Sequence, residues 1–338
     1  MPPDATLPAP GQRSLPDTWR TPLLGLALAV LALGLLAARE WGEMLHQWWN
    51  VDTYNHILLV LPILVWLVAM KGDDLAQTRP RPWLPGLGLV AAALGLWWIG
   101  RASGLNLLAH AGAVGAIQGA VVALLGKRIS LLLALPIGFA AFLVPFGDEI
   151  IAPLQTITAE IAIALTHASG VPAVIDGIYI DTPVGLFIVA EACSGVKFLI
   201  AMVTLGVLVC FTRFDSWSRR ALFMLAAVIV PVLANGVRAW GTIYIAQSQG
   251  VEFAAGFDHI VYGWIFFAIV VGLVLAGAWR FFEREPDDYG WSLAELEAMP
   301  LASDATGGAS IHAALALIVG LTVAVGVAAA IVAPAAIG

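Results

Sequence analysis

The residues best suited to chemistry lie between Leu186 and Ile200, where a glutamate, a cysteine and a lysine occur within one short stretch. Cys193 is followed by Ser194-Gly195, a pair typical of a turn or a helix start, so we expect its thiol at the N-terminal end of a helix. The unpaired N–H groups and the dipole of such an end favour a thiolate, and Lys197, one turn further on, adds positive charge. Cys193 is therefore the candidate nucleophile, the alternative being a small buried cysteine without a chemical role.

Arg238 is the second candidate, because it lies inside an apolar helix expected at about residues 220–245. Insertion of an arginine into such a helix costs roughly 2.5–3.5 kcal/mol, so it is rarely kept without a partner or a function. Asn235 lies three residues earlier on the same helical face and can orient the guanidinium or line the same cavity. The alternative is that Arg238 only extends its side chain to the membrane surface.

His259 opens the next apolar segment and brings a titratable imidazole. Taken alone it also fits an ordinary interfacial histidine, and Asp258 before it fits a helix N-cap. The expected topology, however, puts Cys193, Arg238 and His259 at the same ends of three consecutive spans. These three groups suffice for acyl transfer, in which the thiolate attacks a carbonyl, the imidazole moves the proton and the guanidinium stabilises the oxyanion.

Two further polar residues fit supporting roles. Glu191 suits an ion pair with Arg238 or Lys197, or a simple position at the interface. His56 follows Asn55 at the start of the second expected span, where it either lines the same cavity or anchors the chain at the membrane surface.

No metal or cofactor is expected. His46, His167 and His312 have no ligand spacing with acidic or cysteine partners. The chain also has no Gly-rich phosphate loop, no Gly-x-Ser-x-Gly and no His-Glu-x-x-His, so a nucleotide-driven pump or a zinc protease is unsupported.

Composition indicates an integral membrane protein. Of 338 residues, 60% are hydrophobic and 12% charged, and the mean hydropathy is +0.91. A soluble domain carries about 25% charged residues. There is no basic stripe or nucleic-acid motif, so we exclude nucleic-acid partners. Two cysteines, Cys193 and Cys210, do not make a disulfide framework.

Apolar runs of the length that crosses a bilayer as a helix recur along the chain, and we expect an all-α polytopic fold with about nine spans. The expected spans are about Pro22–Ala38, His56–Met70, Leu84–Gly100, Leu105–Leu125, Ser130–Phe146, Gly195–Phe211, Arg220–Ile245, His259–Phe282 and His312–Ile331.

The distribution of Lys and Arg orients these spans. Only Arg39 and Arg101 lie in loops on one side, whereas twelve basic residues lie on the other. Because cytoplasmic loops are enriched in Lys and Arg, the N-terminus is expected in the cytoplasm. The twelve are Arg13, Arg20, Lys71, Arg79, Arg81, Lys127, Arg128, Arg213, Arg219, Arg220, Arg280 and Arg284.

The long segment 147–192 then falls on the outer side. Ile150, Leu154, Ile157, Ile161 and Leu165 recur at helical spacing, which predicts a short amphipathic helix on the outer leaflet or against the bundle. After that helix, an Asp-Gly pair between β-branched residues predicts a small β-hairpin or meander leading to the cysteine.

These elements give the expected domain organisation. Residues 1–20 form a disordered cytoplasmic tail, 21–285 a multi-span catalytic domain, 286–311 a cytoplasmic linker and 312–338 an additional membrane segment.

At about residues 45–285 the chain resembles the exosortase/archaeosortase family of membrane-embedded sorting enzymes. The resemblance is carried by three motifs in the family order Cys, Arg, His, and by a second-span segment in which Ile57 stands where the family usually has glycine. The motifs are Glu191-Ala-Cys-Ser-Gly-Val196, Asn235-Gly-Val-Arg238, and His259 followed by Gly263-Trp264 and Phe267; the second-span segment is Tyr54-Asn-His56 followed by Leu-Val-Leu-Pro62.

The resemblance implies a cysteine transpeptidase or protease in the bacterial inner membrane, with its active site facing the periplasm. Its substrates would be secreted proteins ending in a sorting tail, made of a short motif (Pro-Glu-Pro in the best-known group), a transmembrane helix and a basic cluster. Cleavage near the motif would proceed through a Cys193 thioester, and the acceptor would be an amine of a surface lipid or glycan. Arg238 and His259 carry over as the transition-state and proton-transfer residues, with their division of labour left open.

Two other classes compete with this interpretation. A transporter using Arg238 to bind an anion would predict polar residues deep in several helices and an inverted repeat, and the sequence has neither. A non-catalytic scaffold for exopolysaccharide or surface export would leave Cys193 incidental.

Overall fold

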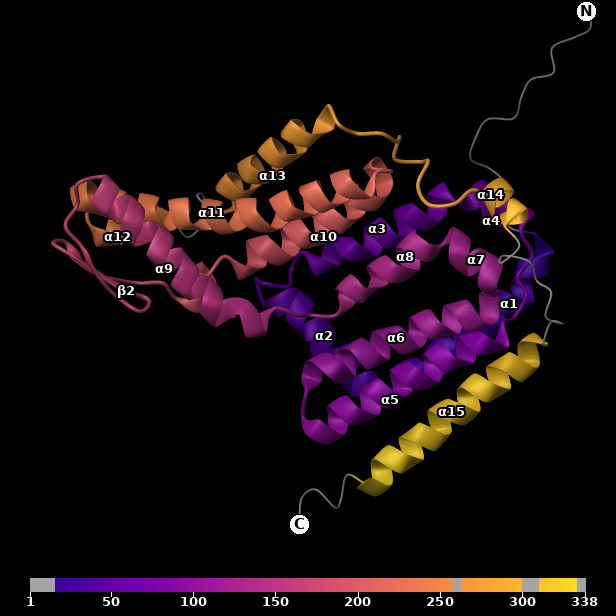
Figure 1. Ribbon diagram of the computed structural model, residues 1–338. Helices are drawn as coiled ribbons and strands as arrows, with labels where there is room; N and C mark the ends of the chain where they lie inside the picture. The colour runs from indigo at the N-terminus through magenta and orange to yellow at the C-terminus, as the bar shows by residue number, and fades with distance from the viewer. Residues whose placement is uncertain (1–15, 258–262, 300–309, 333–338) are drawn as a thin grey trace, which may run out of the picture. The chain divides into compact units, whose positions relative to one another are not determined.

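The computed structural model describes residues 16–257, 263–299 and 310–332, and helices dominate it (Figure 1). Its only sheet in these residues is small and three-stranded. The protein is therefore an all-α polytopic membrane protein, as the sequence predicts. The expected tail at 1–20 and the linker at 286–311 lie partly outside the described residues.

Within the described residues, seven helices are long and apolar enough to cross a membrane, judged by length and composition. Six of them coincide with expected spans, and the seventh is the helix expected on the outer side. They are Asp17–Leu36 (α1, Arg20–Leu36, with a preceding 3-10 turn), Leu84–Ser103 (α5, Leu87–Ser103, with a preceding 3-10 turn), Asn106–Leu125 (α6), Asp148–Ala168 (α9, Ile151–Ala168, likewise preceded by a 3-10 turn), Val196–Arg213 (α10), Trp217–Gln249 (α11) and Ile311–Ile331 (within α15, Ile311–Val332).

The other three expected spans are shorter apolar helices. The second is α3 (Ile57–Met70), and the eighth is described from the start of α13 (Gly263–Trp279). The fifth is wrong as a continuous helix, because it breaks into α7 (Lys127–Leu132), α8 (Ala134–Phe139) and a 3-10 turn. Pro136 explains the break, since it has no N–H for the carbonyl four residues earlier and its ring clashes there.

Short helices connect these elements. They are α2 (Ala38–Asn50), α4 (Gly72–Gln77), α12 (Val251–Phe257) and α14 (Leu293–Ala298).

The chain divides into two compact units, each described by itself. Unit 1 comprises residues 1–50, 57–145 and 290–338, and unit 2 comprises residues 51–56 and 146–289. The expected catalytic domain at 21–285 thus draws on both units.

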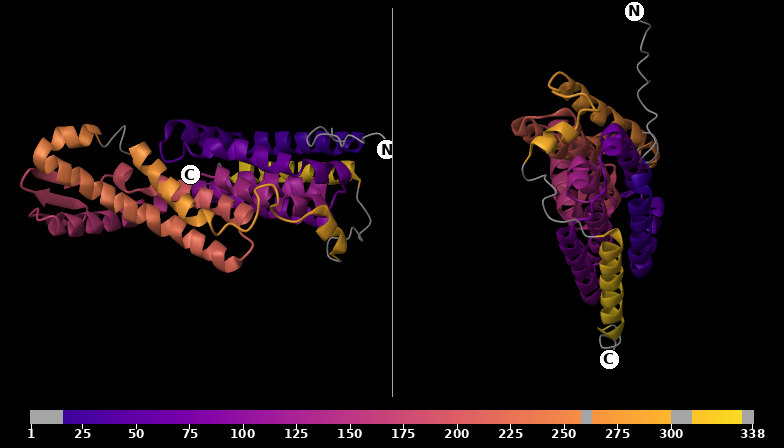
Figure 2. Two further views of the ribbon diagram at one scale, coloured as in Figure 1. Left: turned by 90° about the horizontal axis from the view of Figure 1, so that it is seen from above. Right: turned by 90° about the vertical axis from the view of Figure 1, so that its right-hand side faces the viewer.

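Unit 1 is built around an antiparallel α5–α6 hairpin. Gly100 and Gly112 lie so close to the backbone of the facing helix that a Cβ on either would clash, which explains why small residues fill this contact. α1 and α15 pack on the same core, and Figure 2 shows their ribbons alongside the α5–α6 hairpin. Gly25 faces Ile311 near the start of both helices, and Gly326 faces Leu36 near their ends, so α1 and α15 run in the same direction. The first and the last of nine alternating spans must run in the same direction, because nine is an odd number.

Buried charge in unit 1 is paired at one end of this bundle. Arg101 donates to Glu40, which is buried, at 3.1 Å, and a His110 ring nitrogen lies 3.3 Å from Glu43. These pairs lie among α2, α5 and α6 and account for polar groups that an apolar interior would otherwise leave unsatisfied.

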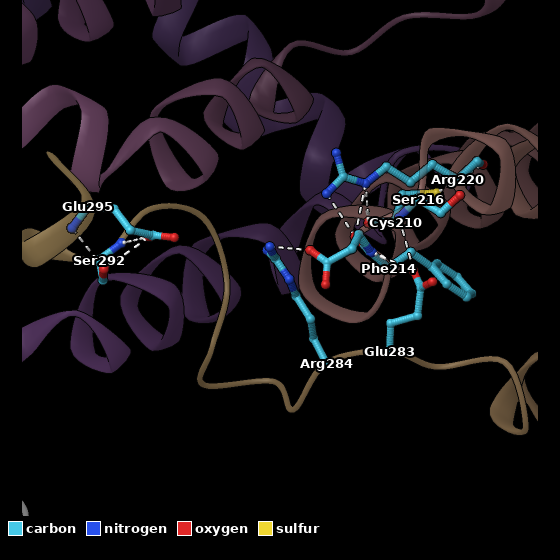
Figure 3. Close-up of polar contacts among 9 residues, drawn as sticks. Cys210, Phe214, Ser216, Arg220, Glu283, Arg284, Ser292 and Glu295 are labelled. Atoms are coloured by element: carbon cyan, nitrogen blue, oxygen red, sulfur yellow. Dashed lines mark hydrogen bonds and ion pairs between the residues drawn. The ribbon is translucent and has the colours of Figure 1, made fainter. Parts of the chain in front are cut away.

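In unit 2, α10 and α11 form an antiparallel pair whose connecting turn is held by charged side chains (Figure 3). The Arg220 guanidinium donates to the carbonyls of Cys210 and Phe214 at 2.7–3.1 Å. Glu283 accepts the backbone N–H groups of Asp215 and Ser216 at 2.7 and 3.0 Å. These bonds satisfy backbone groups that the ends of both helices leave open.

α9 crosses α11 and runs in the same direction. Thr158 contacts Asn235, and further along both helices Ser169 accepts a hydrogen bond from Trp240 at 3.2 Å. Gly236 permits the close approach, because a Cβ there would lie 2.4 Å from the Ile161 side chain.

The buried face of α9 matches the apolar spacing only in part, because Leu154 is buried and Ile161 is partly buried. Ile150 and Ile157 are exposed, whereas Gln155, Thr158 and Thr166 are buried. In a membrane protein the apolar side chains can face lipid, so the interior face is the one whose polar groups need partners. α9 packs against α11, which is one of the two locations expected for it, but the apolar spacing did not indicate the polar side chains on its interior face.

The strands form a meander in the order β1 (Val174–Asp176), β2 (Tyr179–Thr182) and β3 (Gly185–Ile188). Both pairs are antiparallel, and the expected Asp-Gly turn joins the first two, with Gly177 at φ +60°. The buried face of the sheet packs on α9 and α11 through Ile180 and Phe187. This packing places the end of β3 beside the segment that contains the cysteine.

Candidate active site

Cys193 lies in a short 3-10 turn, Glu191–Cys193, immediately before α10. Its N–H donates to the Ala190 carbonyl at 2.8 Å, and its side chain is partly buried. Gly195 takes φ +85° and begins the helix, so the turn expected from Ser194-Gly195 forms. The thiol is therefore at the N-terminal end of α10.

α9 holds this turn in place from one side. The Gln155 side chain donates to the Val189 carbonyl at 2.7 Å, and the Thr158 hydroxyl donates to the Ser194 carbonyl at 3.3 Å. Ser194 is itself buried and accepts the Val196 N–H at 3.3 Å. Because buried backbone groups are costly to leave unpaired, these bonds stabilise the conformation of the segment around Cys193.

Asn235 of α11 holds the same turn. Its Nδ2 donates to the Cys193 carbonyl at 2.9 Å and to the Thr158 hydroxyl at 3.0 Å. A Cβ on Gly195 would lie 2.7 Å from the Asn235 side chain. Glycine at this position is thus required both by the positive φ and by the closeness of the asparagine.

Arg238 lies one turn further along α11 and is 8% exposed. Its Nη1 lies 3.4 Å from Asn235 Oδ1, and its guanidinium carbon lies 5.7 Å from the centre of the Phe198 ring. Phe198 in turn stacks on Phe267 of α13 with ring centres 4.7 Å apart. A cation over an aromatic face is stabilised in a medium of low dielectric constant.

Cys193, Asn235 and Arg238 line one partly open cavity of about 70 Å³. Arg238 is the only charged side chain among the residues described as lining it, so a developing negative charge in the cavity would meet that guanidinium. The other lining residues are Ile180, Phe187, Ile188, Val189, Ala239, Thr242 and Ile243.

Comparison with known proteins identifies the family. The sequence matches the family described as Transmembrane exosortase (Exosortase_EpsH) over residues 48–276, about two thirds of the chain. The chain belongs to the transmembrane exosortase family. No curated protein and no solved structure matches it. The matched range includes Cys193 and Arg238, and it excludes α1 and α15.

Neither candidate histidine of this exosortase can be placed in the cavity from the described residues. His259 lies outside the described residues, so its role as acid and base stays a prediction. His56 lies in the turn before α3, where its Nδ1 donates to the Thr53 carbonyl at 3.0 Å, and it does not line the cavity. The neighbouring Tyr54 hydroxyl donates to Asp148 at 2.5 Å; burial and this bond raise the pKa of Tyr54, which keeps it a donor. Tyr54 of the family-like segment therefore anchors the start of α9.

Two expected supporting residues lie away from the cavity. Glu191 is exposed and forms no ion pair within the described part of the chain. The Lys197 ammonium lies 5.3 Å from the centre of the Phe198 ring and does not line the cavity. Stabilisation of the thiolate by Lys197 accordingly stays a prediction.

Sequence reasoning missed Gln155, Thr158 and Phe198. The first two lie one turn apart on α9, and a search for polar residues at helical spacing would have found them. Phe198 carried no signal of its own, because a phenylalanine in an apolar helix is unremarkable until the facing arginine is known.

Proposed function

We propose that this exosortase is a cysteine transpeptidase that cleaves the C-terminal sorting tail of secreted proteins and transfers the new carboxyl end to an amine. The observation that supports it best is the cavity shared by Cys193 and Arg238. A nucleophile and a fixed cation in one partly enclosed cavity are what acyl transfer needs.

The proposed reaction has two steps. The Cys193 thiolate attacks a peptide carbonyl carbon, its proton having passed to the imidazole of His259, and Arg238 stabilises the oxyanion. The C–N bond then breaks, the imidazole protonates the leaving amine, and a thioester to Cys193 remains. An acceptor amine attacks the thioester, loses a proton to the imidazole and releases the cysteine thiol.

The length of α11 supports a site at the membrane surface. α11 has 33 residues and is thus about 50 Å long, compared with a hydrocarbon core of about 30 Å. Arg238 is 21 residues after Trp217, about 32 Å along the axis. If the basic turn between α10 and α11 lies in the cytoplasm, as the charge distribution predicts, Cys193 and Arg238 reach the outer interface.

This depth suits the proposed substrate. A tail with a transmembrane helix and cytoplasmic basic residues would present the peptide before its helix at the outer interface. Partial exclusion of water from the cavity would favour an amine of a surface lipid or glycan over hydrolysis.

The experiment compares the two cysteines of the chain. The substrate is a secreted protein from the same genome that ends in a short motif, one apolar helix and an Arg-rich terminus. Cys193→Ala should abolish its processing, followed by the shift in mass, while Cys210→Ala, which changes a buried thiol at the other end of α10, should leave processing intact. Full processing by Cys193→Ala would remove the nucleophile, and no processing by the wild type would overturn the proposed function.

A further inference from the structure

The outer edge of β3 is a second feature of this site. β3 pairs with β2 on one side only, because the strand order is β1-β2-β3. The register pairs Ile180 with Phe187 and Asp181 with Leu186, and the Val189 N–H donates to the Ile178 carbonyl at 3.0 Å. Since hydrogen-bonded and non-hydrogen-bonded pairs alternate in an antiparallel ladder, Leu186 and Ile188 direct their backbone groups away from β2.

Most of these outward backbone groups have no hydrogen-bond partner within the described residues. The Ile188 carbonyl accepts the Ala190 N–H at 3.0 Å, which closes the ladder at that end. The N–H and carbonyl of Leu186 and the N–H of Ile188 have no hydrogen-bond partner in the described part of the chain. Both side chains are exposed, at 57% and 52%. An open row of this kind is a template for another strand.

The edge leads directly to the cysteine. Ile188 and Val189 line the same cavity as Cys193 and Arg238. A chain laid along β3 would therefore enter the cavity at the point where the ladder ends, with its next carbonyl close to the thiol.

We infer that the substrate segment preceding its transmembrane helix binds as a fourth strand on the outer edge of β3. This rests on the proposed function and adds how the peptide is recognised. Main-chain bonds to Leu186 and Ile188 provide the affinity, and alternate side chains of the substrate lie beside the exposed side chains of the two residues. The extended conformation also presents the carbonyl to the nucleophile without a helical hydrogen bond to break.

The first test is a disulfide cross-link that needs no catalysis. The exosortase carries Leu186→Cys with Cys193→Ser and Cys210→Ala, and the genomic tail fusion carries single cysteines scanned through the residues before its apolar helix. Because side chains of a strand alternate between two faces, cross-linking should recur at every second substrate position. Uniform cross-linking, or none, would contradict a paired strand.

The second test removes one backbone donor. Leu186→Pro deletes an outward N–H without breaking a bond to β2, and proline is tolerated at such edge positions. Processing should fall about tenfold relative to Leu186→Ala, which changes the side chain but keeps the N–H. Alkylation of Cys193 by iodoacetamide at the wild-type rate in Leu186→Pro would show that the cavity is intact.

The outcomes separate the two proposals. Equal processing by Leu186→Pro and Leu186→Ala, with a wild type that processes the tail, overturns the added strand and leaves the transpeptidase. A wild type that does not process the tail overturns the transpeptidase itself.

Discussion

At the scale of single residues, Asn235 connects the cysteine turn, α9 and Arg238. One amide contacts the carbonyl of the nucleophilic cysteine, the hydroxyl of Thr158 and the guanidinium of Arg238. Asparagine has two donors and one acceptor oxygen, and all are used here. The chemistry of Cys193 thus depends on a residue that does not itself react.

Asn235→Ala should lower both activity and stability. It leaves the partly buried Cys193 carbonyl without its donor, and a loss of roughly 1–3 kcal/mol in the free energy of unfolding is expected. Processing of a tail fusion should fall about tenfold or more, because Arg238 loses its orienting partner. Asn50→Ala, at an exposed position of α2, is the matched control and should change neither measurement. A fully active Asn235→Ala would show that the amide does not position the site.

At the scale of elements, the turn between α10 and α11 sets the register of the two helices that carry Cys193 and Arg238. Glu283 lies after α13 and accepts the Asp215 and Ser216 N–H groups at the start of α11. These bonds hold the pKa of Glu283 below its usual range. A carboxylate also suits the positive end of a helix dipole.

The depressed pKa of Glu283 predicts a pH-dependent effect of Glu283→Gln. Its stabilising contribution is present above the ordinary glutamate pKa and is lost as the pH falls through the lowered value. The variant should have a lower Tm than the wild type in detergent at about pH 7, and the difference should shrink toward about pH 3. Glu285→Gln, with an exposed side chain 3.8 Å from Arg213, should show a smaller effect. A Tm difference independent of pH would exclude this electrostatic cause.

At the scale of the whole molecule, the residues that line the cavity all belong to unit 2. α15 belongs to unit 1 and lies beyond the matched family range. Its buried Ala314 and Ile318 pack against the core that α1 shares with α5 and α6. This placement indicates a structural contribution.

Deletion of residues 300–338 should therefore lower the Tm by a few degrees and leave processing within about twofold of the wild type. The loss is modest because lipid can replace apolar contacts between helices in a bilayer, so mainly packing is lost. Tm in detergent and processing of the tail fusion are the two measurements. A deletion variant that folds but does not process the tail would place a functional role in α15.

Much of the architecture could be predicted from local sequence signals. Hydropathy located the apolar helices, and Asp176-Gly177 and Ser194-Gly195 marked turns that form where expected. Such signals suffice because the bilayer fixes helix length and because turn conformation depends on neighbouring residues. The signal for the break in the fifth span, Pro136, was equally local, but the prediction of a continuous span overlooked it.

The sequence by itself determined a polytopic helical protein with a cysteine at a helix start and an arginine within an apolar helix. Only the tertiary structure decided that α9 turns Gln155 and Thr158 inward, that Asn235 meets the Cys193 carbonyl and that the outer edge of β3 is open beside the cavity. The reason is physical. These facts depend on hydrogen bonds between groups more than 30 residues apart, and in a membrane the apolar pattern does not tell an interior face from one that meets lipid.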